Sequence, residues 1–410
     1  MSAPLAVRLA SARRSARAPV GVAQVVTRLT AGAGGMALEG ALSLDPERYA
    51  TTFFTSEGSS LVPAAEEAGF RVVPLRRMTT GRGVYPWADY RALRELEERL
   101  AEGRFDLVHT HSSKAGALGR IAARRLGVAA VVHTFHGFPF HEFQAAPVRA
   151  ALVAAERRLG RLTDFFLATG TATAAEAVRL GIAPPDRIRA IATVPTGAEV
   201  RRVTPASRRA ARALLALPEE AKAVGTVARL DAQKSPRDLV EAIAALGRDD
   251  VHAVWVGGGS LRAETERLIV RRGLAGRFLL LGERSDVAAL LPAFDVFALS
   301  SLFEGLPCAL VEAMLCGIPV VATAVCSVPE LVIAGSTGLL ARPRDPRSLA
   351  RALAWVLDHP GQARRLAESA RAHVTTRCRR DVLGADLVEV YEAALEGRRA
   401  RSPVPVGAER

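Results

Sequence analysis

The 410-residue sequence predicts an α/β protein of two domains, each built on a doubly wound parallel sheet. Short apolar, β-branched runs alternate with helix-length amphipathic stretches along almost the whole chain, which is the pattern of parallel strands covered by helices on both faces. The apolar fraction of 49% is enough to fill a core in each half. Between the halves, Thr193–Pro205 contains prolines, a glycine and little periodicity, as expected of an interdomain linker.

The expected elements follow in order. The first half contains six expected strands, at Val20–Thr27, Ala50–Thr55, Arg71–Pro74, Leu107–His111, Ala130–His136 and Phe165–Ala168. Helical patterns separate them at Ala88–Gly103, Ala115–Leu126 and Val148–Leu162. The second half contains five expected strands, at Ala223–Ala228, Val251–Val256, Phe278–Leu281, Val296–Leu299 and Pro319–Thr323. We expect domains over residues 20–195 and 205–380, a helix over 381–396, and tails at 1–19 and 397–410.

The net charge of +13 has no dominant basic block, so a solvated arginine-rich surface explains it better than nucleic-acid binding does. The first 19 residues lack the apolar centre of a secretory signal. We expect a disordered tail there, and weak attraction of its arginines to anionic lipid is the alternative. No apolar run approaches the ~18 residues of a membrane-spanning helix. The four cysteines lack C-x-x-C or histidine-partnered spacing, which disfavours zinc sites and disulfides and fits a reducing cytoplasm.

Two cations follow the first strand of the second half. In VGTVARLDAQKSP, Arg229 comes just past the apolar run, and Lys234 precedes Pro236, where a helix begins. A guanidinium fork and an ammonium beside a helix N-terminus suit a pair of phosphates. The expected ligand is therefore a diphosphate leaving group. In the alternative interpretation, Arg229 caps a carbonyl and Lys234 is solvated.

Two glycine-rich turns could approach a ligand with bare N–H groups. The predicted ligand-binding glycines are Gly34, Gly35, Gly257 and Gly258. The second-half turn, WVGGGSLRAE, would also be needed simply for packing. The first-half turn, GAGGMA, matches the G-x-G-x-x-A fingerprint of dinucleotide binding, with Glu57 further on. Several residues separate that turn from its strand, however, which is looser than the fingerprint requires, so we favour a loop that reaches across a cleft toward a diphosphate or an acceptor.

Two glutamates eight positions apart lie in the run SLFEGLPCALVEAM. Glu304 is in a turn and can accept hydrogen bonds from sugar hydroxyls, while the N–H groups of Gly305 and Leu306 can donate to them. Glu312, two helical turns on, can accept both hydroxyls of a ribose. The pair could instead be an acid/base couple for hydrolysis. The absence of any neighbour that would raise one pKa, and the cations upstream, argue against that alternative.

Several histidines lie at or beyond the ends of two first-half strands, namely His109, His111, His133, His136 and His141. A metal site is the weaker interpretation, because the segments lack nearby Cys, Asp or Glu at ligand spacing until Glu142. We expect His109 and His133 to be structural, and His136, beside Gly137, to be a hydrogen-bonding group at the cleft.

Taken together, ARLDAQKSP, VGGGSLRAE, GERSDVAALLPAFDVFALSSLFEGLPCALVEAM and GIPVVATAV resemble the retaining family 4 glycosyltransferases of GT-B fold. The resemblance implies that Arg229 and Lys234 bind the donor diphosphate, that Glu304 faces the transferred sugar and Glu312 the ribose, and that His136 lies near the sugar and acceptor. It also implies that the final helix returns to the first domain. DLVHTHSSKAGALGRIAA is similar to the bacterial capsular and exopolysaccharide subgroup.

The expected reaction is therefore glycosyl transfer with retention, from a nucleoside diphosphate sugar to an acceptor hydroxyl, with Arg229, Lys234, Glu304 and His136 as the catalytic residues. The resemblance implies a front-face route in which the leaving phosphate takes the acceptor proton. No cofactor beyond the sugar nucleotide is expected, and no Asp-x-Asp metal motif occurs. The expected acceptor is a saccharide or lipid-linked saccharide, and the location the cytoplasm, with peripheral contact at the inner membrane face left open. The alternatives are a small-molecule acceptor, an NAD(P)-dependent oxidoreductase, and a non-catalytic sugar-nucleotide-binding protein.

Overall fold

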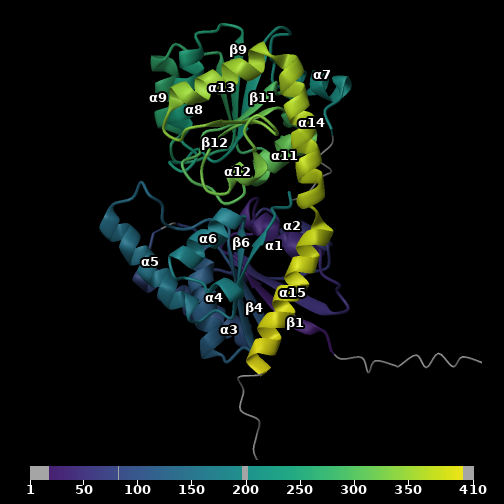
Figure 1. Ribbon diagram of the computed structural model, residues 1–410. Helices are drawn as coiled ribbons and strands as arrows, with labels where there is room; N and C mark the ends of the chain where they lie inside the picture. The colour runs from purple at the N-terminus through teal and green to yellow at the C-terminus, as the bar shows by residue number, and fades with distance from the viewer. Residues whose placement is uncertain (1–17, 82, 196–201, 400–410) are drawn as a thin grey trace, which may run out of the picture.

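The computed structural model describes residues 18–81, 83–195 and 202–399, and shows two α/β domains one above the other (Figure 1). The basic tail and the carboxy-terminal tail fall almost wholly outside these residues, as does the middle of the expected linker.

The first domain holds one sheet of seven parallel strands in the order β3-β2-β1-β4-β5-β6-β7. Its strands are β1 (Val20–Val25), β2 (Tyr49–Ser56), β3 (Arg71–Leu75), β4 (Leu107–His111), β5 (Ala130–Phe135), β6 (Phe165–Thr169) and β7 (Ile188–Ile191). Its helices are α1 (Ala33–Leu42), α2 (Val62–Glu67), α3 (Pro86–Ala101), α4 (Ser113–Arg125), α5 (Ala146–Gly160), α6 (Thr171–Arg179) and the 3-10 turn η1 (Pro185–Arg187). The chain reverses direction across the sheet between β1 and β4, which is where such folds bind ligands.

The second domain repeats this plan with six parallel strands in the order β10-β9-β8-β11-β12-β13. Its strands are β8 (Lys222–Val227), β9 (Val251–Val256), β10 (Phe278–Gly282), β11 (Val296–Leu299), β12 (Val320–Thr323) and β13 (Leu339–Ala341). Its helices are α7 (Pro205–Leu214), α8 (Pro236–Leu246), α9 (Arg262–Arg271), α10 (Val287–Leu290), the 3-10 turn η2 (Leu291–Ala293), α11 (Cys308–Cys316), α12 (Val328–Leu331), α13 (Pro346–Asp358) and α14 (Pro360–Arg377). The last helix, α15 (Arg380–Arg399), follows α14 and packs on the first domain. The predicted fold class, with two doubly wound parallel sheets, is confirmed.

All eleven expected strands are present, and β4, β9 and β11 have the expected bounds. Two strands were missed, β7 with four residues and β13 with three. Both are edge strands; Arg189 interrupts β7, and β13 is too short to produce a recognisable apolar run.

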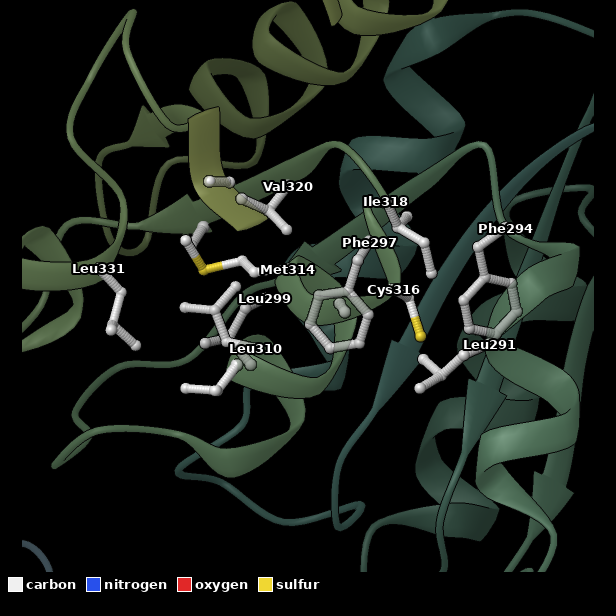
Figure 2. Close-up of a cluster of buried hydrophobic side chains, with 14 of the residues drawn as sticks. Leu291, Phe294, Phe297, Leu299, Leu310, Met314, Cys316, Ile318, Val320 and Leu331 are labelled. Atoms are coloured by element: carbon white, nitrogen blue, oxygen red, sulfur yellow. The ribbon is translucent and has the colours of Figure 1, made fainter. Parts of the chain in front are cut away.

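Each sheet packs its helices over apolar side chains. On one face of the second sheet, Phe297 and Leu299 of β11 lie against Leu310 and Met314 of α11, all of them fully buried (Figure 2). A separate cluster fills the opposite face. Burying apolar area on both faces stabilises the sheet by roughly 25 cal/mol per Å². The strand ends that carry the polar residues are therefore held on a rigid base.

The last two helices connect the domains. In Figure 1, α14 lies along the second domain and α15 continues down across the first. Buried Leu383, Leu387 and Tyr391 of α15 pack into the core beneath β1, β4 and β5. Arg189 of β7 adds an ion pair with Asp386 at 3.1 Å. The carboxy-terminal helix thus forms part of the core of the first domain.

Candidate functional site

The carboxyl ends of the two sheets face each other, and the predicted basic and acidic residues meet there. Lys234, after β8, forms an ion pair with Glu304, after β11. The Lys234 segment is fixed to the end of β11, because Ser300 Oγ donates to Lys234 O at 2.9 Å. Ser301 Oγ also donates to Glu304 Oε1 at 2.6 Å. Both ionic side chains are largely buried, so the pair is a built part of this edge rather than a surface contact.

Arg229 lies on the same edge with its side chain 58% exposed. Its guanidinium contacts Asp231 at 2.9 Å and Gln233 Oε1 at 3.4 Å. Gln233 in turn donates to the carbonyl oxygen of Phe303 at 2.9 Å, which links the Arg229 loop to the Glu304 loop. Arg229 and Lys234, predicted together, therefore lie on one connected loop pair.

The Glu304 loop touches the first domain at Gly305. A Cβ built on Gly305 would lie 2.7 Å from the carbonyl oxygen of His136 and 2.4 Å from Thr169 Oγ1, so only glycine fits without a shift. Thr193 Oγ1 donates to the Leu306 carbonyl at 2.9 Å. Among the described residues, the N–H groups of Gly305 and Leu306 have no hydrogen-bond partner. These two predicted donors remain available beside His136.

Glu312 lies one to two turns into α11, which begins after Pro307, as the sequence predicts. Its half-buried carboxyl has no hydrogen-bond partner among the described residues. Burial raises the pKa of Glu312 to about 7. The sequence argument that nothing would raise the pKa of either glutamate is therefore wrong for Glu312, because burial does so without a charged neighbour.

Gly257 and Gly259 let the end of β9 cross the end of β8. A Cβ on Gly257, whose φ is 135°, would lie 2.1 Å from the Ala228 carbonyl oxygen. Gly258 is less constrained, because a Cβ there would meet only the side chain of Glu283, at 3.1 Å. Packing therefore accounts for Gly257, while the N–H of Gly258 has no backbone partner among the described residues.

Gly34 and Gly35 lie buried in the first turn of α1. A Cβ on Gly34 would lie 2.5 Å from the Arg28 carbonyl oxygen, and Gly35 N–H donates to Thr30 O at 2.8 Å. Gly34 therefore has a packing function, and the Gly35 amide is already used. Ligand contact by these two glycines stays a prediction.

His109, His111, His133 and His136 form a buried, uncharged group beneath the cleft. His109 hydrogen-bonds Tyr391 and Thr134, and His133 hydrogen-bonds Thr110, so the prediction that both are structural is confirmed. His136 lies at the end of β5 with Nε2 2.9 Å from His111 Nδ1. Burial lowers the pKa of His136 to about 4, so its imidazole is neutral at physiological pH. In the described part of the chain, no group of three or more His, Cys, Asp or Glu side chains could hold a metal ion.

A cavity of about 430 Å³ opens between the domains beside Glu304. Its walls combine aromatic and charged side chains, including Phe138, His141, Arg149 and Glu176 from the first domain and Phe303 from the second. His141 stacks on Phe303 across the domain boundary, with ring centroids 4.2 Å apart. The sequence analysis missed Arg149, which belongs to no motif, and assigned no function to Phe303, although Phe303 directly precedes Glu304.

Comparison with known proteins identifies the family. A family model described as "Glycosyl transferase 4-like domain" matches residues 21–194, and one described as "Glycosyl transferases group 1" matches residues 207–373. The chain is 32% identical to an Escherichia coli UDP-Gal:alpha-D-GlcNAc-diphosphoundecaprenol alpha-1,3-galactosyltransferase over 66% of this chain and 71% of that protein. The chain belongs to the group 1 glycosyltransferases. A D-inositol 3-phosphate glycosyltransferase of Streptomyces scabiei is 33% identical, over 72% of this chain and 70% of the relative.

The fold of this group 1 glycosyltransferase is GT-B. It superimposes with a TM-score of 0.76 on a crystal structure of Anabaena HepE in complex with UDP and glucose, at 20% identity, covering 91% of this chain and all of that one. The predicted family and enzyme class, a retaining family 4 glycosyltransferase, are confirmed, and the oxidoreductase interpretation of the GAGGMA turn is set aside. In the described residues, no helix is long and apolar enough to cross a membrane.

Proposed function

We propose that this glycosyltransferase transfers a sugar from a uridine diphosphate sugar to a hydroxyl of a phosphorylated acceptor. One observation supports the donor half above all others: Lys234, Glu304 and Arg229 are fixed at one sheet edge, next to unbonded N–H groups at Gly305 and Leu306. The two cations would bind a diphosphate, and the Glu304 carboxylate and the two backbone N–H groups would hydrogen-bond a sugar. The named relative from Escherichia coli uses a UDP-sugar.

The proposed mechanism depends on stabilising the charge of the leaving diphosphate. When the bond between the anomeric carbon and the β-phosphate oxygen breaks, negative charge grows on the diphosphate. Lys234 and Arg229 stabilise that charge more in the transition state than in the ground state, which lowers the barrier. Lys234 has three N–H donors, so it can keep Glu304 and still bind phosphate. Retention follows from departure and attack on one face, with the leaving phosphate taking the acceptor proton.

Glu312 is the proposed ribose contact. Its carboxyl is half-buried and without a hydrogen-bond partner among the described residues, which is a costly state for a polar group. Two ribose hydroxyls would supply the missing donors. Gly258 is proposed to contact the same nucleotide through its unbonded N–H.

The acceptor is proposed to occupy the cavity beside Glu304. Arg149 Nε in its wall is buried without a hydrogen-bond partner, and Arg149 and Arg179 lie on either side of Glu176, at 3.6 and 2.6 Å. The aromatic faces of Phe138 and Phe303 suit a sugar ring, and the free guanidinium N–H suits a phosphate. Both named relatives use acceptors that carry phosphate or diphosphate.

The favoured acceptor is a saccharide on a polyprenyl diphosphate, as in cell-surface polysaccharide synthesis. Beside the cleft edge of the first domain lies an exposed aromatic patch, defined as Val84, Tyr85, Trp87 and Tyr90. Trp87 is 74% exposed and stacks on Tyr90, and Arg77 and Arg91 are exposed nearby. Amphipathic aromatics with arginines suit the interface of an anionic membrane. We therefore propose a peripheral contact with the inner membrane face, in the cytoplasm.

An inositol phosphate is the second candidate acceptor, because several relatives are named for it.

A donor screen tests the first half of the proposal: hydrolysis of UDP-, GDP-, ADP- and dTDP-sugars, measured as nucleotide release without acceptor, should favour UDP. Addition of a GlcNAc-diphosphate polyprenol analogue or of inositol 3-phosphate should then accelerate release. Equal, negligible hydrolysis of all donors would refute the proposed donor site.

A further inference from the structure

A chain of buried hydrogen bonds runs from the carboxy-terminal helix to His136. Tyr391 of α15 is fully buried, and its hydroxyl accepts from Gln24 Nε2 at 3.0 Å. Gln24 Oε1 lies 2.7 Å from His111 Nε2, and His111 Nδ1 lies 2.9 Å from His136 Nε2. Gln24 and His111 are at most 3% exposed. The segments involved are β1, β4, β5 and α15, which are far apart in sequence.

The chain of hydrogen bonds has a defined donor-to-acceptor direction. A carbonyl oxygen only accepts, so His111 Nε2–H must donate a hydrogen bond to Gln24 Oε1. His111 is neutral, because burial first, and then the neighbouring His109, His136 and His133, lower its pKa well below the usual value. A neutral imidazole protonated at Nε2 accepts at Nδ1, so His136 must donate from its own Nε2.

The remaining nitrogen of His136 is therefore an acceptor. Among the described residues, none hydrogen-bonds His136 Nδ1. His136 adjoins Gly137, where a Cβ would lie 3.6 Å from Gly305 N, so the imidazole is next to the loop that carries Glu304. On the other branch, the Tyr391 hydroxyl lies 2.7 Å from His109 Nδ1, and His109 Nε2 lies 2.7 Å from Thr134 Oγ1.

We propose that Tyr391, Gln24 and His111 are positioning residues that fix His136 in its Nε2-protonated tautomer, so that Nδ1 accepts a hydrogen bond from a hydroxyl of the bound sugar. The inference about the sugar rests on the proposed function, whereas the tautomer does not. The carboxy-terminal helix thus acts on the cleft through hydrogen bonds that cross β1 and β4. A donor nitrogen at this position would meet the hydroxyl's oxygen instead and would select a different orientation.

Nitrogen-15 NMR of histidine-labelled protein tests the tautomer directly, with His136→Asn to assign the signal. We expect the proton on Nε2 and an unprotonated Nδ1 from about pH 6 to about pH 8, where an ordinary histidine titrates. His136 should stay neutral over this range, because burial lowers its pKa to about 4. A proton on Nδ1 of His136 would overturn the inference, whether or not the enzyme shows transferase activity. Failure of the donor screen would instead count against the proposed function alone.

Gln24→Glu tests the direction. A carboxylate raises the pKa of His111, and doubly protonated His111 would donate from Nδ1, which forces His136 to accept at Nε2 and to carry its proton on Nδ1. With saturating donor, kcat of this variant should then be low at pH 6 and recover as the pH rises through the new pKa of His111, while the wild-type kcat is flat over that range. A Gln24→Glu profile parallel to wild type would contradict the proposal.

Tyr391→Phe frees the Gln24 amide, so we expect mixed His136 tautomers and a loss in kcat/KM for the donor of about tenfold, the value of one hydrogen bond. Tyr49→Phe is the matched control. Tyr49 packs edge-on against Tyr391 at 5.8 Å, but its hydroxyl takes no part in the chain. If both Tyr→Phe variants lose activity equally while His136 keeps a single tautomer, packing explains the effect and the inference is wrong.

Discussion

Lys234 and Glu304, which are 70 positions apart in the sequence, form a largely buried ion pair at the carboxyl edge of the second sheet. The pair exists because β11 pairs in parallel with β8, so the loops that follow these two strands leave the sheet side by side. It holds a cation and a carboxylate in fixed positions before any ligand arrives. Such preorganisation reduces the reorganisation required at the moment of reaction.

Replacing Lys234 with alanine should lower kcat at least about a hundredfold, since a charge contact to the leaving diphosphate worth roughly 3 kcal/mol is removed. Lys222→Ala is the control, because Lys222 is exposed at the opposite, amino end of β8. Initial-rate kinetics with a saturating UDP-sugar measure the effect. Because the substitution leaves Glu304 buried without its cation, thermal unfolding should be recorded in parallel. A folded variant with an unchanged rate would reject the proposed clamp.

Donor binding should strengthen as the pH rises through about 7, the pKa of the half-buried Glu312 carboxyl. Ribose hydroxyls donate hydrogen bonds, so they favour the ionised carboxylate, and binding releases the proton that the free enzyme holds below that pH. Calorimetric titration with UDP at pH 6 and pH 8 should show the higher affinity at pH 8. Glu312→Gln should bind more weakly and lose this dependence. A dependence that survives in Glu312→Gln would assign the titration to another group.

The sequence was a good guide wherever a feature is local. Val251–Val256 is apolar except for His252, and its bounds as a strand were predicted without error. The pairing of Lys234 with Glu304 was not predictable, because it depends on which strands become neighbours. The raised pKa of Glu312 was missed for a related reason: it comes from burial, which is a property of the folded environment and not of adjacent letters.

The same limit applies to the first domain. The hydrogen bond between His109 and Tyr391 joins residues 282 positions apart, and no motif includes either Tyr391 or Gln24. Motif reasoning found His136 through its place before a glycine at a strand end. It could not find the residues that orient His136, since these are recognisable only once α15 lies against the first sheet.

Arg149→Ala should raise the KM for a phosphorylated acceptor about tenfold or more and leave donor hydrolysis unchanged. The reason is that Arg149 lies in the cavity wall and not at the diphosphate edge. Arg158→Ala is the matched control on the same helix, because Arg158 is exposed and does not line the cavity. Transfer assays at fixed donor and varied acceptor measure the change. Equal effects of both substitutions would show that the acceptor does not bind in this cavity.

Trp87→Ala should weaken binding to vesicles that contain phosphatidylglycerol by about tenfold, because burial of a large aromatic side chain contributes roughly 1.5–3 kcal/mol. Co-sedimentation measures the bound fraction, and pure phosphatidylcholine vesicles should bind little protein. Val270→Ala provides the control, since Val270 is 67% exposed on the second domain, far from the aromatic patch in the fold. If Val270→Ala reduces binding as much as Trp87→Ala does, the aromatic patch is not the contact surface.

Gly305→Ala should lower kcat/KM at least about tenfold while the melting temperature changes little. The added Cβ would lie 2.7 Å from the His136 carbonyl oxygen. Because this oxygen belongs to the backbone and cannot rotate away, the loop must move or the domains must separate. Either response displaces the Gly305 N–H from the sugar, whereas the cores of both domains stay intact. Gly361→Ala is the control, because a Cβ on Gly361 meets nothing within 4 Å. Small-angle scattering would detect domain opening, and a fully active Gly305→Ala enzyme would show that this close approach is not needed for transfer.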